Sequence, residues 1–126
     1  MGDPRHDLGR RAEAAVAAWL EGNGWHILAR RQRSSVGGEV DLIALDPDAI
    51  LVAVEVRARH SARTGAAAFS VDARRLVRMH RTLAAFAAGH GRRHAGLRLD
   101  LVTLEPEPGS GSGRWRLRRL PGIGGE

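Results

Sequence analysis

Two neighbouring segments decide the fold of this chain, Gly38-Glu39-Val40-Asp41-Leu42-Ile43 and Val54-Glu55-Val56-Arg57-Ala58-Arg59. Both read as apolar strands that carry acidic residues, and the turn Asp46-Pro47-Asp48 between them predicts an antiparallel hairpin. Residues two apart on a strand share a face, so Glu39 and Asp41 are expected to point the same way. The hairpin would bring Asp41 and Glu55 together at one end of a sheet.

Carboxylates on apolar strands cost free energy unless a cation neutralises them. One solution is a hard cation such as Mg²⁺, which one or two carboxylates hold together with substrate phosphate. The other is a pair of ordinary ion pairs, Glu39 with Arg33 and Glu55 with Arg57. The spacing of the residues alone leaves both interpretations open.

The remaining pattern predicts a single domain over residues 1–126. Apolar residues at helical spacing indicate helices over 6–20 and 71–88, and apolar runs indicate strands over 25–29, 39–45, 50–57 and 97–104. An arginine-rich stretch follows the first strand, residues 60–70 form a loop, and a flexible loop covers 105–113. Residues 115–120 are expected to form an edge strand and 121–126 a frayed tail. The order is αβββαβ with one added strand.

The charge of the chain points to a polyanionic partner. All twenty basic residues are arginine, the net charge is +6 and the pI is about 11.5. Such a balance in a small domain favours nucleic acid. The chain has no cysteine, and neither a signal peptide nor an apolar run long enough to span a bilayer is evident. A cytoplasmic protein that does not bind membranes is therefore expected.

The second predicted helix carries arginines at a spacing of three, four and seven residues, opposite its apolar stripe. Such a stripe is usually a solvated helix face. Further arginines lie in the first half of the chain, so a phosphate-contacting surface is the alternative that we favour. The arginines that we predict to bind nucleic acid are Arg33, Arg59, Arg74, Arg75 and Arg78.

The two opening segments resemble the YraN family of small bacterial proteins, and the similarity extends over about residues 8–105. Gly9 and Glu13 in the first helix, Arg33, Gly65 with Val71, and the segment Arg98-Leu99-Asp100 also fit this family. The YraN family in turn resembles the PD-(D/E)XK nucleases, the restriction endonuclease-like and Holliday junction resolvase-like superfamily. The resemblance implies an α/β fold with a restriction endonuclease-like αβββαβ core, in which helices flank a mixed central sheet.

The resemblance also implies roles for the acidic residues. Asp41 matches the metal-binding aspartate of the superfamily and Glu55 the acidic residue of its Glu-x-Lys motif, and the carbonyl of Val56 would supply a third ligand to Mg²⁺ or Mn²⁺. Glu13 matches a first-helix glutamate that joins the metal site in resolvase-like members, although a solvent-facing helical glutamate is an equal alternative. Glu39 is expected to support the ligands or position water.

The chain departs from the superfamily at Arg57, which stands where a lysine is expected. Arginine does not deprotonate in a protein, so Arg57 is expected to stabilise charge on phosphate rather than to act as a base. The resulting hypothesis is a metal-dependent nuclease acting on DNA, branched or single-stranded, with RNA as the lesser candidate. The alternatives are a catalytically inactive nucleic-acid-binding module on the same fold and a protein-interaction domain. The edge strand would also permit a homodimer.

Overall fold

The computed structural model of the protein describes residues 4–35, 37–58, 71–107 and 114–124. Two helices and five strands follow one another along the chain. Their bounds are α1 (Pro4–Gly22), β1 (His26–Arg33), β2 (Glu39–Leu45), β3 (Ile50–Ala58), α2 (Ala73–His90), β4 (Gly96–Pro106) and β5 (Trp115–Pro121).

The five strands form one mixed sheet in the order β1-β2-β3-β4-β5. Strands β1, β2 and β3 form an antiparallel meander, in which Leu42 pairs with Val54. Strand β4 runs parallel to β3, and α2 connects the two, as a parallel pair requires a crossover. Strand β5 returns antiparallel to β4 and forms an edge of the sheet. The predicted α/β architecture is confirmed, and it is consistent with a restriction endonuclease-like core.

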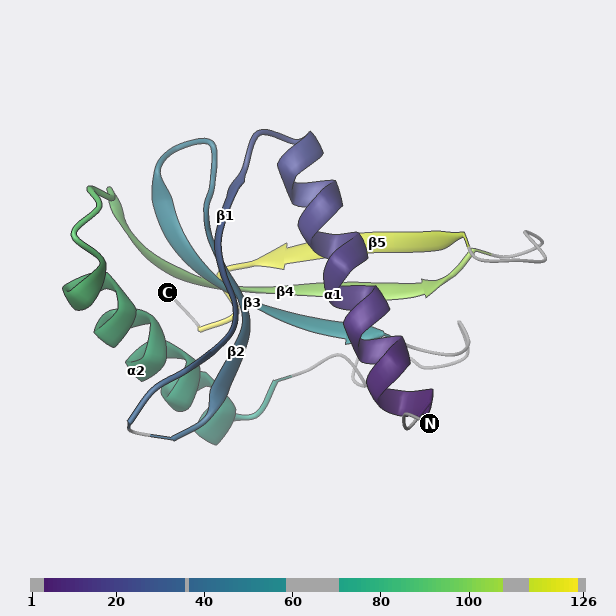
Figure 1. The fold of residues 1–126 in the computed structure, drawn as a ribbon, viewed down its shortest axis with the longest axis horizontal. Helices are drawn as coiled ribbons and strands as arrows, with labels where there is room; N and C mark the ends of the chain where they lie inside the picture. The colour runs from purple at the N-terminus through teal and green to yellow at the C-terminus, as the bar shows by residue number, and fades with distance from the viewer. Residues whose placement is uncertain (1–3, 36, 59–70, 108–113, 125–126) are drawn as a thin grey trace.

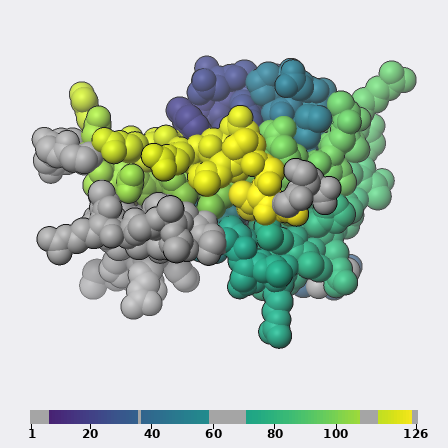
Figure 2. Space-filling model, turned by 180° about the vertical axis from the view of Figure 1, so that it is seen from behind, coloured from purple at the N-terminus to yellow at the C-terminus, as the bar shows by residue number. Residues whose placement is uncertain are grey.

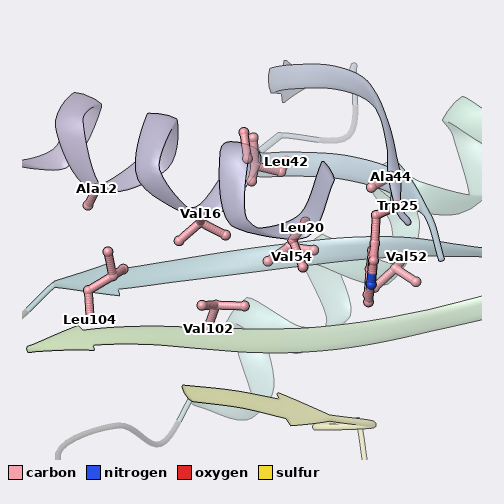
Figure 3. Packing of buried hydrophobic residues seen from close by; sticks show 11 residues of the cluster. Ala12, Val16, Leu20, Trp25, Leu42, Ala44, Val52, Val54, Val102 and Leu104 are labelled. Carbon is pink, nitrogen blue, oxygen red and sulfur yellow. The ribbon is translucent and has the colours of Figure 1, made fainter. Parts of the chain in front are cut away.

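The two helices cover opposite faces of the sheet (Figure 1). On one face, Val16 and Leu20 of α1 pack on apolar side chains of β2, β3 and β4, as Figure 3 shows. On the other face, Met79 and Leu83 of α2 pack on Val40, Ile43, Leu45, Leu51, Ala53 and Leu99. Because both faces are covered, β3 is buried from Leu51 to Glu55, and its sequence is a nearly continuous apolar run.

Several element boundaries differ from the sequence-based prediction. Strand β1 continues through the arginine-rich stretch as far as Arg33, because its backbone pairs with β2 up to Glu39. It is the other edge of the sheet, and all of its residues are exposed or half-buried. Helix α2 begins two residues later than expected and ends at His90, where Gly91 caps it in the left-handed conformation. Strand β4 extends to Pro106, beyond the expected end at residue 104.

The C-terminal tail, which was expected to fray from residue 121, is held by the sheet. Pro121 belongs to β5, and the backbone N–H of Ile123 donates to the carbonyl of Leu99 at 2.9 Å. The side chain of Ile123 packs against the α2 side of the core. The predicted loop over 60–70, including Gly65, lies outside the described residues.

Helix α2 starts with an N-cap at Asp72, whose Oδ1 accepts the backbone N–H of Arg75 at 2.8 Å. We expect Asp72→Ala to lower the free energy of unfolding by about 1 kcal/mol, because this N–H would lose its partner. Urea denaturation of the wild type and the variant measures the difference. Asp72→Asn, which keeps an acceptor, should lose less than half as much, and equal losses in the two variants would refute the capping role.

Candidate functional site

The candidate site forms where β2 and β3 stop pairing. The ladder between these strands ends at Leu42 and Val54, and just beyond it the Asp41 carboxylate takes the position of a ladder partner. Its Oδ2 accepts the backbone N–H of Val56 at 2.8 Å. The alternation of β2 also breaks here, since Val40 packs on the α2 side and Leu42 on the α1 side. The prediction that Glu39 and Asp41 share a face assumed a regular strand, and β2 is not regular at this point.

Asp41 and Glu55 lie together, and their proximity perturbs the chemistry of Asp41. Burial is the largest influence, and the adjacent Glu55 carboxylate adds electrostatic repulsion and a hydrogen bond between the two groups. Together with the field of Glu13, these effects raise the pKa of Asp41 from 3.8 to about 7, against the opposing hydrogen bond from Val56. Two carboxyl groups held this closely favour a proton or a cation between them.

Glu55 is buried, with 9% of its side chain exposed, and it faces α2. Arg75 approaches it with two donors, Nη2 at 2.8 Å from Oε1 and Nε at 3.3 Å from Oε2. The same Nη2 also donates to the backbone carbonyl of Glu39. The prediction had placed Arg75 in an exposed arginine stripe, but the structure turns it onto the acidic site. Its position four residues before buried Met79 is the signal that the stripe interpretation overlooked.

Glu13 approaches the site from α1, on the other face of the sheet. Its side chain is 14% exposed, so the alternative of a solvent-facing helical glutamate is wrong. Its Oε1 accepts from Nη1 of Arg31 at 3.0 Å. Arg31 adopts a φ of 49°, and the register places it opposite Asp41. Left-handed backbone is uncommon for arginine, so the distortion of β1 coincides with the irregularity in β2.

The oxygen donors at this site suit Mg²⁺, which needs few protein ligands, better than they suit a metal ion that protein side chains coordinate on all sides. Among the residues that the structure describes, no three His, Cys, Asp or Glu side chains are arranged to hold an ion. Asp41 and Glu55 offer a carboxylate pair, and Mg²⁺ needs only one or two carboxylates because it keeps several waters or takes substrate phosphate. The N–H of Val56 points towards Asp41, and the N–H and C=O of one strand residue point to the same side, so its carbonyl also faces this position.

Of the other predicted site residues, Arg57 contacts Glu55 directly and Arg33 contacts Glu39. Nη2 of Arg57 lies 3.6 Å from Oε2 of Glu55, and Nε of Arg33 lies 3.3 Å from Oε2 of Glu39. Both of the ordinary ion pairs that competed with the metal interpretation are therefore present. Arg74 and Arg78 are exposed on α2, and the side chain of Arg78 lies against Gly38. Arg59 lies outside the described residues.

A groove of about 710 Å³ lies elsewhere, between α2, the start of β4 and the C-terminal residues. Figure 2 shows this face, with α2 beside the C-terminal segment. Leu76, Val77, Leu97 and Leu99 contribute much of its wall. None of the acidic residues discussed above lines it, so it is separate from the candidate site. The structure describes no helix that is both long enough and apolar enough to cross a membrane.

The sequence did not predict a second cluster of charged residues, which extends towards the turn that joins β2 and β3. Asp100 is fully buried, and its carboxylate accepts from Nε and Nη2 of Arg98 at 2.8 and 3.1 Å, from Nη1 of Arg119 at 3.0 Å and from the N–H of Gly122 at 3.1 Å. Arg98 also reaches Asp46 at 2.8 Å. All of these charges are paired, so the cluster reads as a structural element that joins β4, β5 and the tail.

Asp46, which lies in the same cluster, is buried at the end of β2. Burial would raise its pKa, but hydrogen bonds from the N–H groups of Ile50 and Asp48 and from Arg98 hold the pKa below its usual value. The carboxylate form is therefore favoured in the folded state. Both guanidinium groups of the cluster also lie over the ring of Trp25, at 5.9 Å for Arg98 and 5.3 Å for Arg119.

Comparison with known proteins places the chain among small bacterial relatives. The model of the uncharacterised protein family UPF0102 matches residues 12–104. A UPF0102 protein of Bordetella avium is 42% identical over 90% of this chain and 74% of its own length. A relative from an Arthrobacter species is 37% identical over 93% of this chain and 95% of its own length. A third, from Deinococcus radiodurans, is 41% identical over 82% and 84%.

Proposed function

The chain belongs to the uncharacterised protein family UPF0102, and we propose that it is a metal-dependent nuclease that hydrolyses phosphodiester bonds in nucleic acid. The observation that carries the proposal is the pair formed by half-buried Asp41 and buried Glu55, which meet at the end of the β2–β3 ladder. A structural ion pair needs one acid and one base. Here two acids approach each other in an apolar sheet, at a cost that a bound cation would offset.

Each residue of the site has a definite part in this proposal. Asp41 and Glu55 would hold Mg²⁺ or Mn²⁺, with the carbonyl of Val56 as a further oxygen donor, and Glu13 is close enough to add negative field. When bound, the ion polarises the phosphoryl oxygen and lowers the pKa of water. Glu39 would position water. Arg57 would stabilise charge on the phosphate, since a guanidinium donates hydrogen bonds but does not accept a proton.

The substrate class follows from the charge of the surface. Arg74 and Arg78 are exposed on α2, the helix that also carries Arg75, and Arg33 is exposed at the end of β1, where it pairs with Glu39. The whole chain carries a net charge of +6. Arginine contacts to phosphate fix the position of a nucleic acid without reading its bases. We therefore propose DNA as the main substrate, with selection by structure, such as branches or single strands, rather than by sequence.

A cleavage assay tests this proposal. Duplex, single-stranded and four-way-junction DNA, with a matched RNA, are incubated with the protein in Mg²⁺, in Mn²⁺ or in EDTA. We expect cleavage of at least one DNA substrate that requires the metal and is lost in Asp41→Ala and Glu55→Ala. Cleavage that persists unchanged in both variants would remove the assignment of these residues.

A second candidate function is a nucleic-acid-binding module that no longer catalyses hydrolysis. The specific observation in its favour is the Arg75–Glu55 ion pair, which neutralises one acid of the site without a metal. This candidate predicts affinity for DNA that falls steeply with salt and is the same in Mg²⁺ and in EDTA. Binding that requires the divalent ion would favour the nuclease instead.

A further inference from the structure

Arg75 occupies the direction from which a cation would approach Glu55. Its guanidinium contacts both carboxylate oxygens, at 2.8 and 3.3 Å, and a third bond reaches the carbonyl of Glu39. With 21% of the Arg75 side chain and 9% of the Glu55 side chain exposed, the pair is largely shielded from solvent. The negative charge of Glu55 is thus already matched by a cation that belongs to the protein.

A divalent cation and this guanidinium would compete for the same acid. The Glu55 oxygens that would bind the metal are the ones that Arg75 now contacts. A metal beside an undisplaced guanidinium would also experience direct repulsion, which is strong where solvent is largely excluded. The ion pair is therefore expected to weaken metal binding in the absence of substrate.

Phosphate offers Arg75 an equivalent partner. A guanidinium forms the same two parallel hydrogen bonds with phosphate as with carboxylate. Arg75 lies between exposed Arg74 and Arg78 on α2, where a nucleic acid backbone would contact the helix. The backbone of Arg75 is anchored through its N–H to Asp72, so a rotation of the side chain alone would move the guanidinium from Glu55 to a phosphate.

We propose that Arg75 is a positioning residue that exchanges Glu55 for a substrate phosphate, so that nucleic acid and the divalent metal bind cooperatively. The inference rests on the proposed function, because it assumes that Glu55 is a metal ligand. Without substrate, Arg75 keeps Glu55 neutralised and the metal binds weakly. With substrate, the guanidinium moves to the phosphate and the freed carboxylate binds the ion.

Thermodynamic linkage requires that nucleic acid and Mn²⁺ change each other's affinity by the same factor, and known cases indicate its size. Cooperativity between two sites of one protein changes affinity by about 5- to 150-fold, and each ligand changes the affinity for the other by the same factor. Saturating nucleic acid should therefore raise the affinity for Mn²⁺ by such a factor. Saturating Mn²⁺ should raise the affinity for nucleic acid equally.

Calorimetric titration tests the proposal without relying on catalysis. Mn²⁺ is titrated into the wild type, Arg75→Gln, Arg75→Lys and the control Arg11→Gln, which changes an exposed arginine of α1, each alone and each with a saturating phosphorothioate-linked DNA duplex, which resists hydrolysis. Far-ultraviolet circular dichroism and thermal unfolding establish that every variant folds. Arg75→Lys keeps the positive charge but loses the two-pronged contact, so it supplies an intermediate case if Arg75→Gln is unstable.

We expect the wild type and Arg11→Gln to bind Mn²⁺ at least about fivefold more tightly with DNA than without it. Arg75→Gln should bind Mn²⁺ more tightly than the wild type without DNA, and added DNA should change that affinity little. Equal Mn²⁺ affinities in the wild type and Arg75→Gln, or an equal effect of DNA on both, would overturn the proposal even if the protein cleaves DNA. Failure of all four proteins to bind Mn²⁺ under either condition would overturn the proposed function together with this inference.

Discussion

Asp41→Asn is expected to inactivate the protein and, in the absence of metal, to make it more stable. Loss of a residue that merely supports a metal ligand typically costs 10- to 100-fold, so loss of a direct ligand should lower cleavage by more than about a hundredfold. Asparagine keeps an oxygen that accepts the Val56 N–H, as the Asp41 carboxylate does at 2.8 Å. It removes the ionisable group that burial and Glu55 disfavour.

The gain in stability should depend on pH in a defined direction. The pKa of Asp41 is raised from 3.8 to about 7, so between these values the folded state holds a proton that the unfolded state has released. The stability of the wild type therefore falls as pH rises from about 4 to 7, by at most about 4 kcal/mol, and stays lowered above pH 7. Asparagine does not ionise, so Asp41→Asn does not lose stability in this way. We expect it to be about 1–3 kcal/mol more stable than the wild type at pH 8 and no more stable at pH 4.

Urea denaturation in EDTA at pH 4, 6 and 8 measures this difference, with Glu21→Gln, an exposed acid of α1, as the control. Added Mg²⁺ should stabilise the wild type at pH 8 and leave Asp41→Asn unchanged, because a ligand stabilises only the state that binds it. A variant less stable than the wild type in EDTA at pH 8 would contradict the account of Asp41 as a destabilising acid.

Asp100→Ala is expected to lower the free energy of unfolding by about 3–5 kcal/mol, a large part of the stability of a typical domain. Asp100 is fully buried and accepts hydrogen bonds from Arg98, Arg119 and the N–H of Gly122. Its removal would leave two partly buried guanidinium groups without their shared carboxylate. It would also release the tail that follows β5.

Chemical denaturation at pH 7 measures this loss, and Asp48→Ala serves as the control because the Asp48 side chain is exposed in the turn after β2. The control should change stability by less than about 0.5 kcal/mol. An Asp100→Ala protein within about 1 kcal/mol of the wild type would show that the cluster is dispensable. Because the guanidinium groups that hold Asp100 lie over Trp25 on the α1 side of the sheet, whereas Glu55 faces α2, Mn²⁺ binding by the folded fraction should be retained.

The sequence predicted the fold where one face of an element is apolar. Helices α1 and α2 carry apolar residues at helical spacing, strands β2, β3 and β4 carry apolar runs, and the structure contains all five. The end of β1 was missed because Arg30, Arg31 and Arg33 lie on an edge strand whose side chains remain exposed. A strand held mainly by backbone pairing with one neighbour shows little hydrophobic pattern. The sequence also did not predict that the C-terminal tail is attached to the sheet. This attachment depends on hydrogen bonds to Asp100 and to the backbone of Leu99, which leave no hydrophobic pattern in the tail.

The candidate site was predictable to the extent that it is local. Asp41 and Glu55 belong to one hairpin, so their spacing in the sequence was enough to bring them together. Arg75 was not placed there, because helical spacing gives the face of a residue but not the strand beneath it. The ion-pair cluster around Asp100 could not be predicted from the sequence. Its partner Arg119 lies on another strand, and Asp46, which also pairs with Arg98, is far away in the sequence.

The arginines of β5 have a consequence for how copies of the protein meet. Arg116 and Arg118 are exposed on this strand, which is an edge of the sheet and pairs on its outer side with no other strand in the described part of the chain. Two such strands aligned side by side would bring like charges into register. Exposed edge strands invite uncontrolled aggregation, and charged side chains are a common protection against it. The side chains that make β5 a poor template for self-association leave its outer side better suited to a polyanion than to another copy of itself.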